Sequence, residues 1–365
     1  MKCERITLTH VRIPLVQPFK ISSGEVREKD AILVTVAAGG LEGVGEASPM
    51  SGSFYSEETP ESTWETLVDA ILPRMLGQPL AGILEGMGRL TNGYALAGVE
   101  TALQDLEAQR QGLPLYRMLG GSKKKIESGL AVGIAETIPE LIETIEHYLA
   151  DGYKRVKIKI QPGWDLEPLA EIRRVLGEIP LMVDANCAYR ASDQDHLRRL
   201  DDYDLMMIEQ PLPREDLAGH ARLQELLHTP LCLDESASTP AQVREAIRLG
   251  SCKIVNIKIQ RVGGLAGALE IHRICARAGI PVWGGTMPEL GIGGGQTLHL
   301  CTLPNFLYPT DVEASRRWFI EDIIEPLIEV ERGEIAIPPG AGTGYRLNRE
   351  AVNRYRVREG VFRRE

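Results

Sequence analysis

Five short apolar runs, each ending in a charged residue, recur along this chain at nearly constant spacing. Their charged ends are Lys159, Asp184, Glu209, Asp234 and Lys258, and the steps between them are 25, 25, 25 and 24 residues. A step of this length accommodates one strand and one crossover helix. The spacing therefore predicts a parallel sheet that carries the five charged side chains at one edge.

Three further runs extend this rhythm to eight strands, at residues 130–134, 281–286 and 306–311. Amphipathic helices are predicted between the strands, at residues 139–150, 166–176, 194–200, 217–226, 240–249 and 265–278. Eight parallel strands with intervening helices close into a (β/α) barrel of the TIM type. An open doubly wound sheet is the alternative, but it would not bring five consecutive strand ends to one mouth.

The first part of the chain has a different pattern. Residues 6–14 and 31–38 have strand character, Gly39-Gly40 predicts a hairpin turn, and helical periodicity covers residues 61–75 and 94–110. We predict an α+β capping domain over residues 1–120, an α/β barrel over residues 121–325, and a C-terminal segment, residues 326–365, that returns to the capping domain.

Composition limits the kinds of partner. The formal net charge is -10 and the pI is near 5.4, which argues against nucleic acid or an anionic membrane surface as a partner. The six cysteines form no Cys-x-x-Cys pair, and most lie in apolar runs, as buried free thiols of a reducing compartment do. The chain has neither a signal-peptide pattern nor an apolar run of about 18 residues, so we expect a cytoplasmic protein.

Asp184, Glu209 and Asp234 end three consecutive predicted strands and would stand side by side at the barrel mouth. Three unpaired carboxylates repel one another unless they surround a cation. Oxygen ligands without His or Cys indicate Mg²⁺. A single strand-end acid is usually a salt-bridge partner or a helix cap, but equal spacing of three favours a shared site.

Lysines flank the three acids. Lys157 and Lys159 are two residues apart in a strand, so both point inward. If Lys159 faces Lys258 across a substrate at about 6 Å, an effective dielectric of about 20 gives a repulsion near 3 kcal/mol, or about two pKa units. This repulsion would favour a neutral lysine that removes a proton next to a carboxylate, while the metal stabilises the resulting ene-diolate.

The charged strand ends lie in five motifs: Lys157-Ile-Lys159, Val183-Asp-Ala-Asn186, Ile208-Glu-Gln-Pro211, Leu233-Asp-Glu-Ser236 and Asn256-Ile-Lys258. This series resembles the enolase superfamily, muconate lactonizing enzyme subgroup, which is known for a lysine or histidine base and Mg²⁺. Further stretches, including Ile160-Gln-Pro-Gly-Trp-Asp165 and Arg261-Val-Gly-Gly264, resemble its o-succinylbenzoate synthase and N-acylamino acid racemase branch.

The resemblance implies a modified (β/α) barrel beneath a capping domain, one Mg²⁺ that Mn²⁺ can replace, and a small carboxylate substrate. It also implies roles for the residues of the site: metal ligands Asp184, Glu209 and Asp234; acid/base residues Lys159 and Lys258; Lys157 beside the substrate carboxylate; and Asn186 and Glu235 beside the ligands. Cap loops at residues 19–24 and 50–56 would close over the substrate. The predicted substrate contacts there and at the mouth are Phe19, Ser22, Tyr55, Trp283 and Glu289.

The branch implies a lyase, o-succinylbenzoate synthase, which dehydrates a cyclohexadiene carboxylate in menaquinone synthesis, with an isomerase, N-acylamino acid racemase, as the alternative. A dipeptide epimerase is less supported, because the Asp-x-Asp usual at its eighth strand is Thr310-Asp311-Val312 here. Muconate cycloisomerase is also less supported. A non-catalytic barrel would lack at least one of the five strand-end residues, and none is missing. We expect a homo-oligomer.

The segment after the seventh run departs from the branch. Leu290 and Gly294 stand where a polar and a basic residue are usual, and Pro288 precedes Glu289. We interpret the glycines at 293–295 as a turn at the barrel mouth and His299 as a structural residue of a helix. These departures bear on the identity of the substrate and leave the metal ligands and the lysines unchanged.

Overall fold

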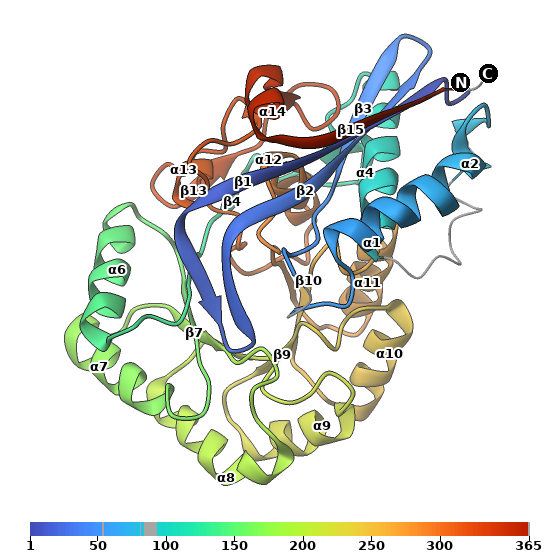
Figure 1. The fold of residues 1–365 in the computed structure, drawn as a ribbon. Helices are drawn as coiled ribbons and strands as arrows, with labels where there is room; N and C mark the ends of the chain where they lie inside the picture. The colour runs from blue at the N-terminus through green and yellow to red at the C-terminus, as the bar shows by residue number, and fades with distance from the viewer. Residues whose placement is uncertain (53–54, 81, 84–92, 364–365) are drawn as a thin grey trace.

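The charged strand ends belong to a curled, seven-stranded parallel sheet in the computed structural model, which describes residues 1–52, 55–80, 82–83 and 93–363 (Figure 1). In spatial order the strands are β5 (Leu130–Val132), β6 (Val156–Lys159), β7 (Leu181–Asp184), β8 (Ile208–Glu209), β9 (Leu231–Leu233), β10 (Ile254–Ile257) and β11 (Val282–Gly284). Lys159 is paired with Asp184 in the ladder, and Asp184 with Glu209. The predicted barrel-type fold is confirmed.

The predicted eighth strand, residues 306–311, is not a regular strand. Its backbone nevertheless reaches both edges of the sheet: Leu307 N–H donates to Val282 O of β11 (3.0 Å), and Gly129 N–H, directly before β5, donates to Thr310 O (2.8 Å). Pro309 lies between these two contacts and has no N–H to donate, so a continuous ladder cannot form. The segment therefore closes the barrel through isolated bridges.

Helices cover the outside of the sheet (Figure 1). They are α6 (Ile138–Ala150), α7 (Leu166–Leu176), α8 (Gln194–Leu197) with the 3₁₀ turns η2 (Ala191–Asp193) and η3 (Arg198–Tyr203), α9 (Leu217–Leu226), α10 (Pro240–Leu249) and α11 (Leu265–Arg277). Local sequence motifs mark the residues at which these helices begin. Thr137, for example, caps α6 in a capping box with Glu140, and Leu141 and Ile145 then fall on the buried face.

The prediction of a turn at residues 293–295 was wrong, because these glycines lie inside the buried helix α12 (Gly291–Cys301). A Cβ on Gly295 would lie 2.6 Å from the ring of Tyr345, and one on Gly294 would lie 3.2 Å from Ile328. Close packing of α12 against the C-terminal part of the chain explains the glycines.

The cap is a four-stranded antiparallel sheet with the order β15-β1-β2-β3, made of β1 (Arg5–Ile21), β2 (Gly24–Ala38), β3 (Leu41–Ala47) and β15 (Arg356–Arg363). The expected loop at residues 18–24 is instead the end of a long hairpin. Pro14 and Pro18 cannot donate to the ladder, so the register shifts between Pro14 and Phe19 and the strands then continue to a tight turn at Ser22. The Gly39-Gly40 turn between β2 and β3 is confirmed.

The cap helices are α1 (Pro60–Glu65), the π-helical η1 (Thr66–Ile71), α2 (Leu72–Met75), α4 (Gly93–Arg110) and α5 (Leu115–Met118). The remaining elements are β4 (Lys125–Glu127) with β13 (Glu334–Ala336), β12 (Ile324–Glu325) with β14 (Arg346–Leu347), α13 (Ser315–Trp318) and α14 (Arg349–Tyr355). The division of the chain at residues 120 and 325 stays a prediction.

The β1–β2 hairpin reaches over the barrel mouth (Figure 1). Ile134 N–H donates to Lys20 O (2.9 Å), and Ser22 Oγ donates to Ala185 O (3.4 Å), directly after β7. The hairpin tip therefore lies against the strand ends that carry the predicted site. All six cysteines are free, and no helix in the described ranges is long and apolar enough to cross a bilayer.

Candidate active site

Asp184, Glu209 and Asp234 lie at the carboxyl ends of β7, β8 and β9, and none of them is exposed to solvent. Each carboxylate has a polar partner on another strand. These contacts are Lys159 Nζ to Asp184 Oδ2, 2.5 Å; Asn256 Nδ2 to Glu209 Oε1, 2.7 Å; and Lys258 Nζ to Asp234 Oδ2, 2.9 Å. The structure thus brings the predicted acids and lysines into one buried cluster.

The three carboxylates also influence one another. Burial, together with the charges of Asp184 and Asp234, raises the pKa of Glu209 to about 8. Such a concentration of buried oxygen donors fits a hard divalent cation in its chemistry. As the side chains are placed, however, no three His, Cys, Asp or Glu residues within the described ranges form a group that could hold a metal ion. The lysines supply the compensating charge, and the metal assignment stays a prediction.

Lys157 is the least exposed of the three lysines at the strand ends. Its Nζ lies 3.4 Å from Glu209 Oε2 and 3.9 Å from Asp184 Oδ2, and it also forms a short ion pair with Asp311. Burial lowers its pKa, but these three carboxylates outweigh burial and raise it. Lys157 is therefore a fixed positive charge between the acids and the segment that closes the barrel.

Lys258 lies on the other flank of the acids. Besides Asp234, its Nζ contacts Tyr55 Oη at 3.4 Å, and Arg261 binds both Asp234 and the Tyr55 hydroxyl. We predicted that repulsion between lysines lowers one lysine pKa. For Lys258, burial lowers the pKa, but the charge of Asp234 outweighs burial and raises it. The effect of a substrate between the two lysines stays a prediction.

Asn186 and Glu235 connect the two flanks. Asn186 Oδ1 accepts from Lys159 Nζ (3.0 Å), and its Nδ2 donates to Glu235 Oε1 (3.0 Å). Asn186 has a φ of 42°, a left-handed conformation that Asn tolerates better than most residues. Burial and the nearby Asp234 raise the pKa of Glu235 to about 7. Both residues lie beside the acids, as the sequence predicts.

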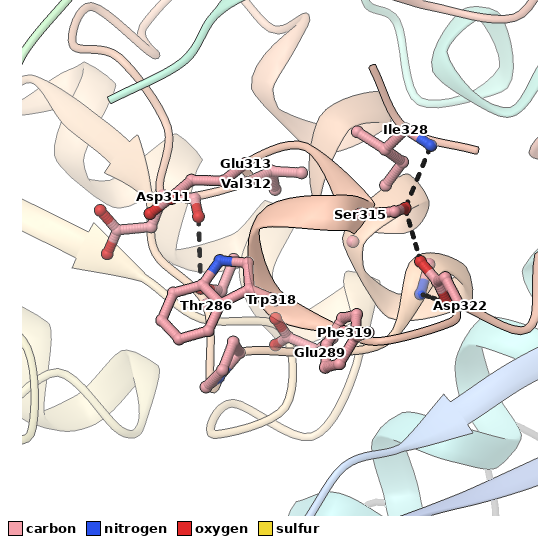
Figure 2. Close-up of a pocket in the computed structure, with 13 residues that line it drawn as sticks. Thr286, Glu289, Asp311, Val312, Glu313, Ser315, Trp318, Phe319, Asp322 and Ile328 are labelled. Carbon is pink, nitrogen blue, oxygen red and sulfur yellow. Dashed lines mark hydrogen bonds between the residues drawn. The ribbon is translucent and has the colours of Figure 1, made fainter. Parts of the chain in front are cut away.

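A cavity opens between the segment after β11 and residues 311–328 (Figure 2). Glu289 lines it and is buried, and its Oε1 has no hydrogen-bond partner among the residues that the structure describes. Trp318, on the same wall, meets the Phe19 ring edge-on with 4.9 Å between centroids. The Phe19 ring in turn lies 6.0 Å from Lys159 Nζ. Phe19 and Glu289 thus lie near the acid/base cluster.

Two of the predicted substrate contacts, Trp283 and Ser22, contact other parts of the protein. Trp283 is fully buried in the barrel core, where its indole N–H donates to Cys232 Sγ (3.3 Å) and its ring lies 4.9 Å below Lys157 Nζ. Trp283 thus packs against Lys157, and its role as a substrate contact stays a prediction. Ser22 is tied to Ala185 O. Residues 53 and 54 of the predicted 50–56 loop lie outside the described residues, whereas Tyr55 contacts Lys258.

Four site residues were not assigned a role from the sequence. Asn256 is two residues before Lys258 and therefore shares its face of β10, a signal that strand alternation could have given. Asp311 ends the predicted eighth strand and pairs with Arg155 (2.8 Å). Gln210 accepts from Asp234 N–H (3.0 Å). Arg261 follows β10 in a turn, and no periodicity points to it.

Comparisons with known proteins cover both parts of the chain. Residues 4–120 match the family described as "Mandelate racemase / muconate lactonizing enzyme, N-terminal domain", and residues 140–351 match "Enolase C-terminal domain-like".

The chain is 45% identical to an o-succinylbenzoate synthase of Geobacillus stearothermophilus, covering 99% of this chain and 98% of that one. It is 38% identical to an N-succinylamino acid racemase of Thermus thermophilus, covering 97% of each. A solved structure of an enolase superfamily member from Listeria innocua aligns with a TM-score of 0.94 at 34% identity, covering 100% of this chain and 99% of that one.

Proposed function

The chain belongs to the enolase superfamily, in its mandelate racemase and muconate lactonizing enzyme family, and we propose that it is a lyase of the o-succinylbenzoate synthase type. The observation that carries the proposal is the pair Lys159 and Lys258, which are buried on opposite flanks of three carboxylates. Such an arrangement suits removal of a proton next to a substrate carboxylate.

Lys159 and Lys258 have different roles in this reaction. Lys159 lies nearest the hairpin and the Phe19 ring, and we assign it the removal of the proton from the substrate carbon. Lys258 is held as a cation by Asp234, so it stabilises the negative charge of the ene-diolate from the other flank. In the dehydration, Lys159 then returns its proton to the hydroxyl group that leaves as water.

Asp184, Glu209 and Asp234 are the residues that would hold a divalent cation, and we propose Mg²⁺, with Mn²⁺ able to replace it. When bound, such a cation supplies positive charge that offsets the three carboxylates and stabilises charge developing on the substrate carboxylate. Lys157 adds a fixed positive charge next to the same oxygens. The family as a whole depends on divalent metals.

Racemisation of N-acylamino acids is the second candidate. It needs a proton donor on the face opposite the base, and Lys258 occupies that flank. The relative named N-succinylamino acid racemase, at 38% identity over nearly the full length, supports the same alternative. Both reactions share the first half-reaction, removal of the proton, and differ in the fate of the ene-diolate.

One experiment separates the two functions. The enzyme is incubated with Mg²⁺ and either the synthase substrate or a panel of N-acylamino acids, and the values of kcat/KM are compared. We expect the synthase substrate to have the highest value, and a chelator to stop turnover until Mg²⁺ is restored. Higher efficiency with an N-acylamino acid would favour the racemase, and undiminished turnover in chelator would refute the metal assignment.

We further propose a small-molecule carboxylate as the only type of partner at this site, a cytoplasmic location and a homo-oligomer. The buried free thiols support a reducing compartment. Size-exclusion chromatography with light scattering would measure the oligomeric state.

A further inference from the structure

Glu46, at the end of β3 in the cap sheet, is a fully buried carboxylate that contacts the barrel. Its Oε1 accepts from Leu290 N–H (2.8 Å) and its Oε2 accepts from Gly293 N–H (2.8 Å). Both N–H groups belong to the start of α12, which has no side-chain cap of its own because its N-cap residue is Leu290. Glu46 therefore caps a barrel helix from the other sheet.

The position of Glu46 is fixed within the cap. Ser48 Oγ donates to Glu46 Oε1 (2.8 Å), and Lys29 Nζ donates to Ser48 O (3.0 Å) and Pro49 O (3.2 Å). Lys29 is itself 2% exposed, and its charge lies close enough to Glu46 and Glu289 to influence both. Burial lowers the pKa of Lys29 and raises the pKa of Glu46 to about 8, and the attraction between the two groups opposes both shifts.

A second connection runs from Glu46 to the strand that carries Lys258. Gln260, two residues after Lys258, donates through Nε2 to Glu46 O (2.7 Å), and its Oε1 accepts from Ser48 N–H (3.0 Å). Gln260 is fully buried. The end of β3 is therefore bonded both to the start of α12 and to the chain just beyond the predicted acid/base residue.

The segment that Glu46 holds is a wall of the cavity. Thr286, Pro288, Glu289 and Gly291 line that cavity, and Leu290, which donates to Glu46, lies between the last two. A displacement of Leu290 would move Glu289 and Pro288 relative to Lys258. Displacements of about 1 Å can cost about a hundredfold in rate when reacting groups must be aligned.

We propose that Glu46 is a positioning residue for the reaction: it holds the 286–291 segment in register with Lys258 by capping α12 from the cap sheet. This inference rests on the proposed function, because it assigns the cavity wall to the substrate. It concerns a residue that touches neither the substrate nor the predicted metal ligands.

The test compares Glu46→Gln with a matched control, Asp105→Asn. Asp105 is also a buried carboxylate of the cap, and it accepts from two backbone N–H groups of other segments, Val44 (3.0 Å) and Thr343 (2.8 Å). Neither of those segments lines the cavity. The two substitutions should thus lower the thermal midpoint similarly. A difference between them in hydrogen exchange or kcat/KM then reports on the position of the 286–291 segment.

Hydrogen exchange is measured first on the full-length protein. In Glu46→Gln, where an amide NH₂ faces a backbone N–H, we expect peptides covering residues 286–294 to exchange about tenfold faster than in the wild type. The same peptides should be unchanged in Asp105→Asn. Unchanged exchange in Glu46→Gln would overturn the assignment of Glu46.

Kinetics with Mg²⁺ and the better of the two substrate classes are measured next, well below the midpoint of each variant. We expect kcat/KM to fall about ten- to a hundredfold in Glu46→Gln and to stay within about twofold in Asp105→Asn. An equal fall in both variants would mean a merely structural role. If Glu46→Gln does not fold, Ser48→Ala removes one bond to the same carboxylate and should change the same peptides and kcat/KM to a smaller extent.

Failure of the proposed function has a different signature. A wild-type enzyme that turns over neither substrate class would refute the proposed function, and the exchange experiment alone would then decide whether Glu46 holds the 286–291 segment.

Discussion

At the scale of single residues, Lys159 and Lys258 are not equivalent. Lys159 contacts Asp184 and Asn186, whereas Lys258 shares Asp234 with a second cation, Arg261. Each lysine approaches the cluster from its own strand, on either side of β7, β8 and β9. A substrate held between them presents one face to each.

We therefore expect Lys159→Ala and Lys258→Ala to affect an N-acylamino acid differently. In deuterated buffer with Mg²⁺, Lys159→Ala should lose α-proton exchange by about 10²- to 10⁴-fold, the range for a lost general base. Lys258→Ala should keep the exchange that Lys159 catalyses and lose the conversion of one enantiomer into the other. Proton NMR measures the exchange. Lys253→Ala, at an exposed lysine just before β10, is the control and should exchange both enantiomers normally. Exchange of both enantiomers in Lys159→Ala would contradict the assignment of the base.

His299 in α12 makes protein stability depend on pH. Its Nδ1 accepts from Tyr116 N–H (3.0 Å), so the hydrogen bonds assign the proton to Nε2, which donates to Thr343 O (2.9 Å). Burial lowers the pKa of His299 to about 4, from an ordinary value of 6.5. The unfolded chain thus binds a proton that the folded chain excludes. The contribution is fully present above pH 6.5 and is lost as the pH falls towards 4.

The difference between these values corresponds to about 3 kcal/mol of unfolding free energy. Urea unfolding at several pH values should show the wild type losing about this amount, relative to His299→Gln, between pH 6.5 and 4. His299→Gln is expected to be less stable at pH 7, because it cannot keep both hydrogen bonds. A constant difference between the two proteins over this range would contradict the role of His299.

At the scale of secondary-structure elements, the β1–β2 hairpin brings an aromatic side chain from the cap to the barrel mouth. Phe19 lies after the register shift and contacts Trp318, a residue of the cavity wall. The register shift moves the hairpin tip out of the cap sheet, so the tip contacts Ala185 and Lys159 rather than other cap strands. The bulged hairpin is therefore the part of the cap nearest the predicted base.

Phe19→Ala should accordingly impair catalysis more than folding. We expect kcat/KM to fall at least about tenfold, since the substitution removes an aromatic contact beside the predicted base and opens the mouth to water. Steady-state kinetics and thermal melts measure the two effects. Val16→Ala changes an exposed residue of the same strand, 49% accessible, and should leave kcat/KM near the wild-type value. Equal values of kcat/KM in the two variants would contradict the assignment of the hairpin to the active site.

The sequence could predict the elements whose local patterns agree with the fold. The strand-end residues, from Lys159 to Lys258, were found because a buried parallel strand reads as an apolar run and the crossover length is nearly constant. The rest depends on contacts between distant segments. Residues 306–311 are predicted as a regular strand but close the barrel through isolated bridges, and nothing near Glu46 shows that it caps α12. The glycines of α12 suggested a turn because the ring of Tyr345, which they accommodate, is about 50 residues away.

At the scale of the whole molecule, the cap and the barrel share one hydrophobic core. A single cluster of buried residues includes Val11 and Ile13 of β1 together with Ile257 of β10 and Leu298 of α12. A second cluster, mostly of cap residues, includes Met287 from the segment after β11. Buried polar bonds such as Glu46 to Gly293 cross the same boundary. The boundary between cap and barrel is thus packed like a protein interior and not like a transient interface.

We therefore expect the cap and the part of the barrel that shares this core to unfold together, although chains of this length often unfold in stages. Pulse-labelling hydrogen exchange along a urea titration gives a separate midpoint for each peptide. Peptides from β2 and from α11 should lose protection at the same urea concentration, because separating them would expose the shared core and leave Glu46 without its partners. If β2 peptides instead lost protection at a distinctly lower concentration, the cap would be an independent unit, and closure of the site would then depend on docking of the cap rather than on folding.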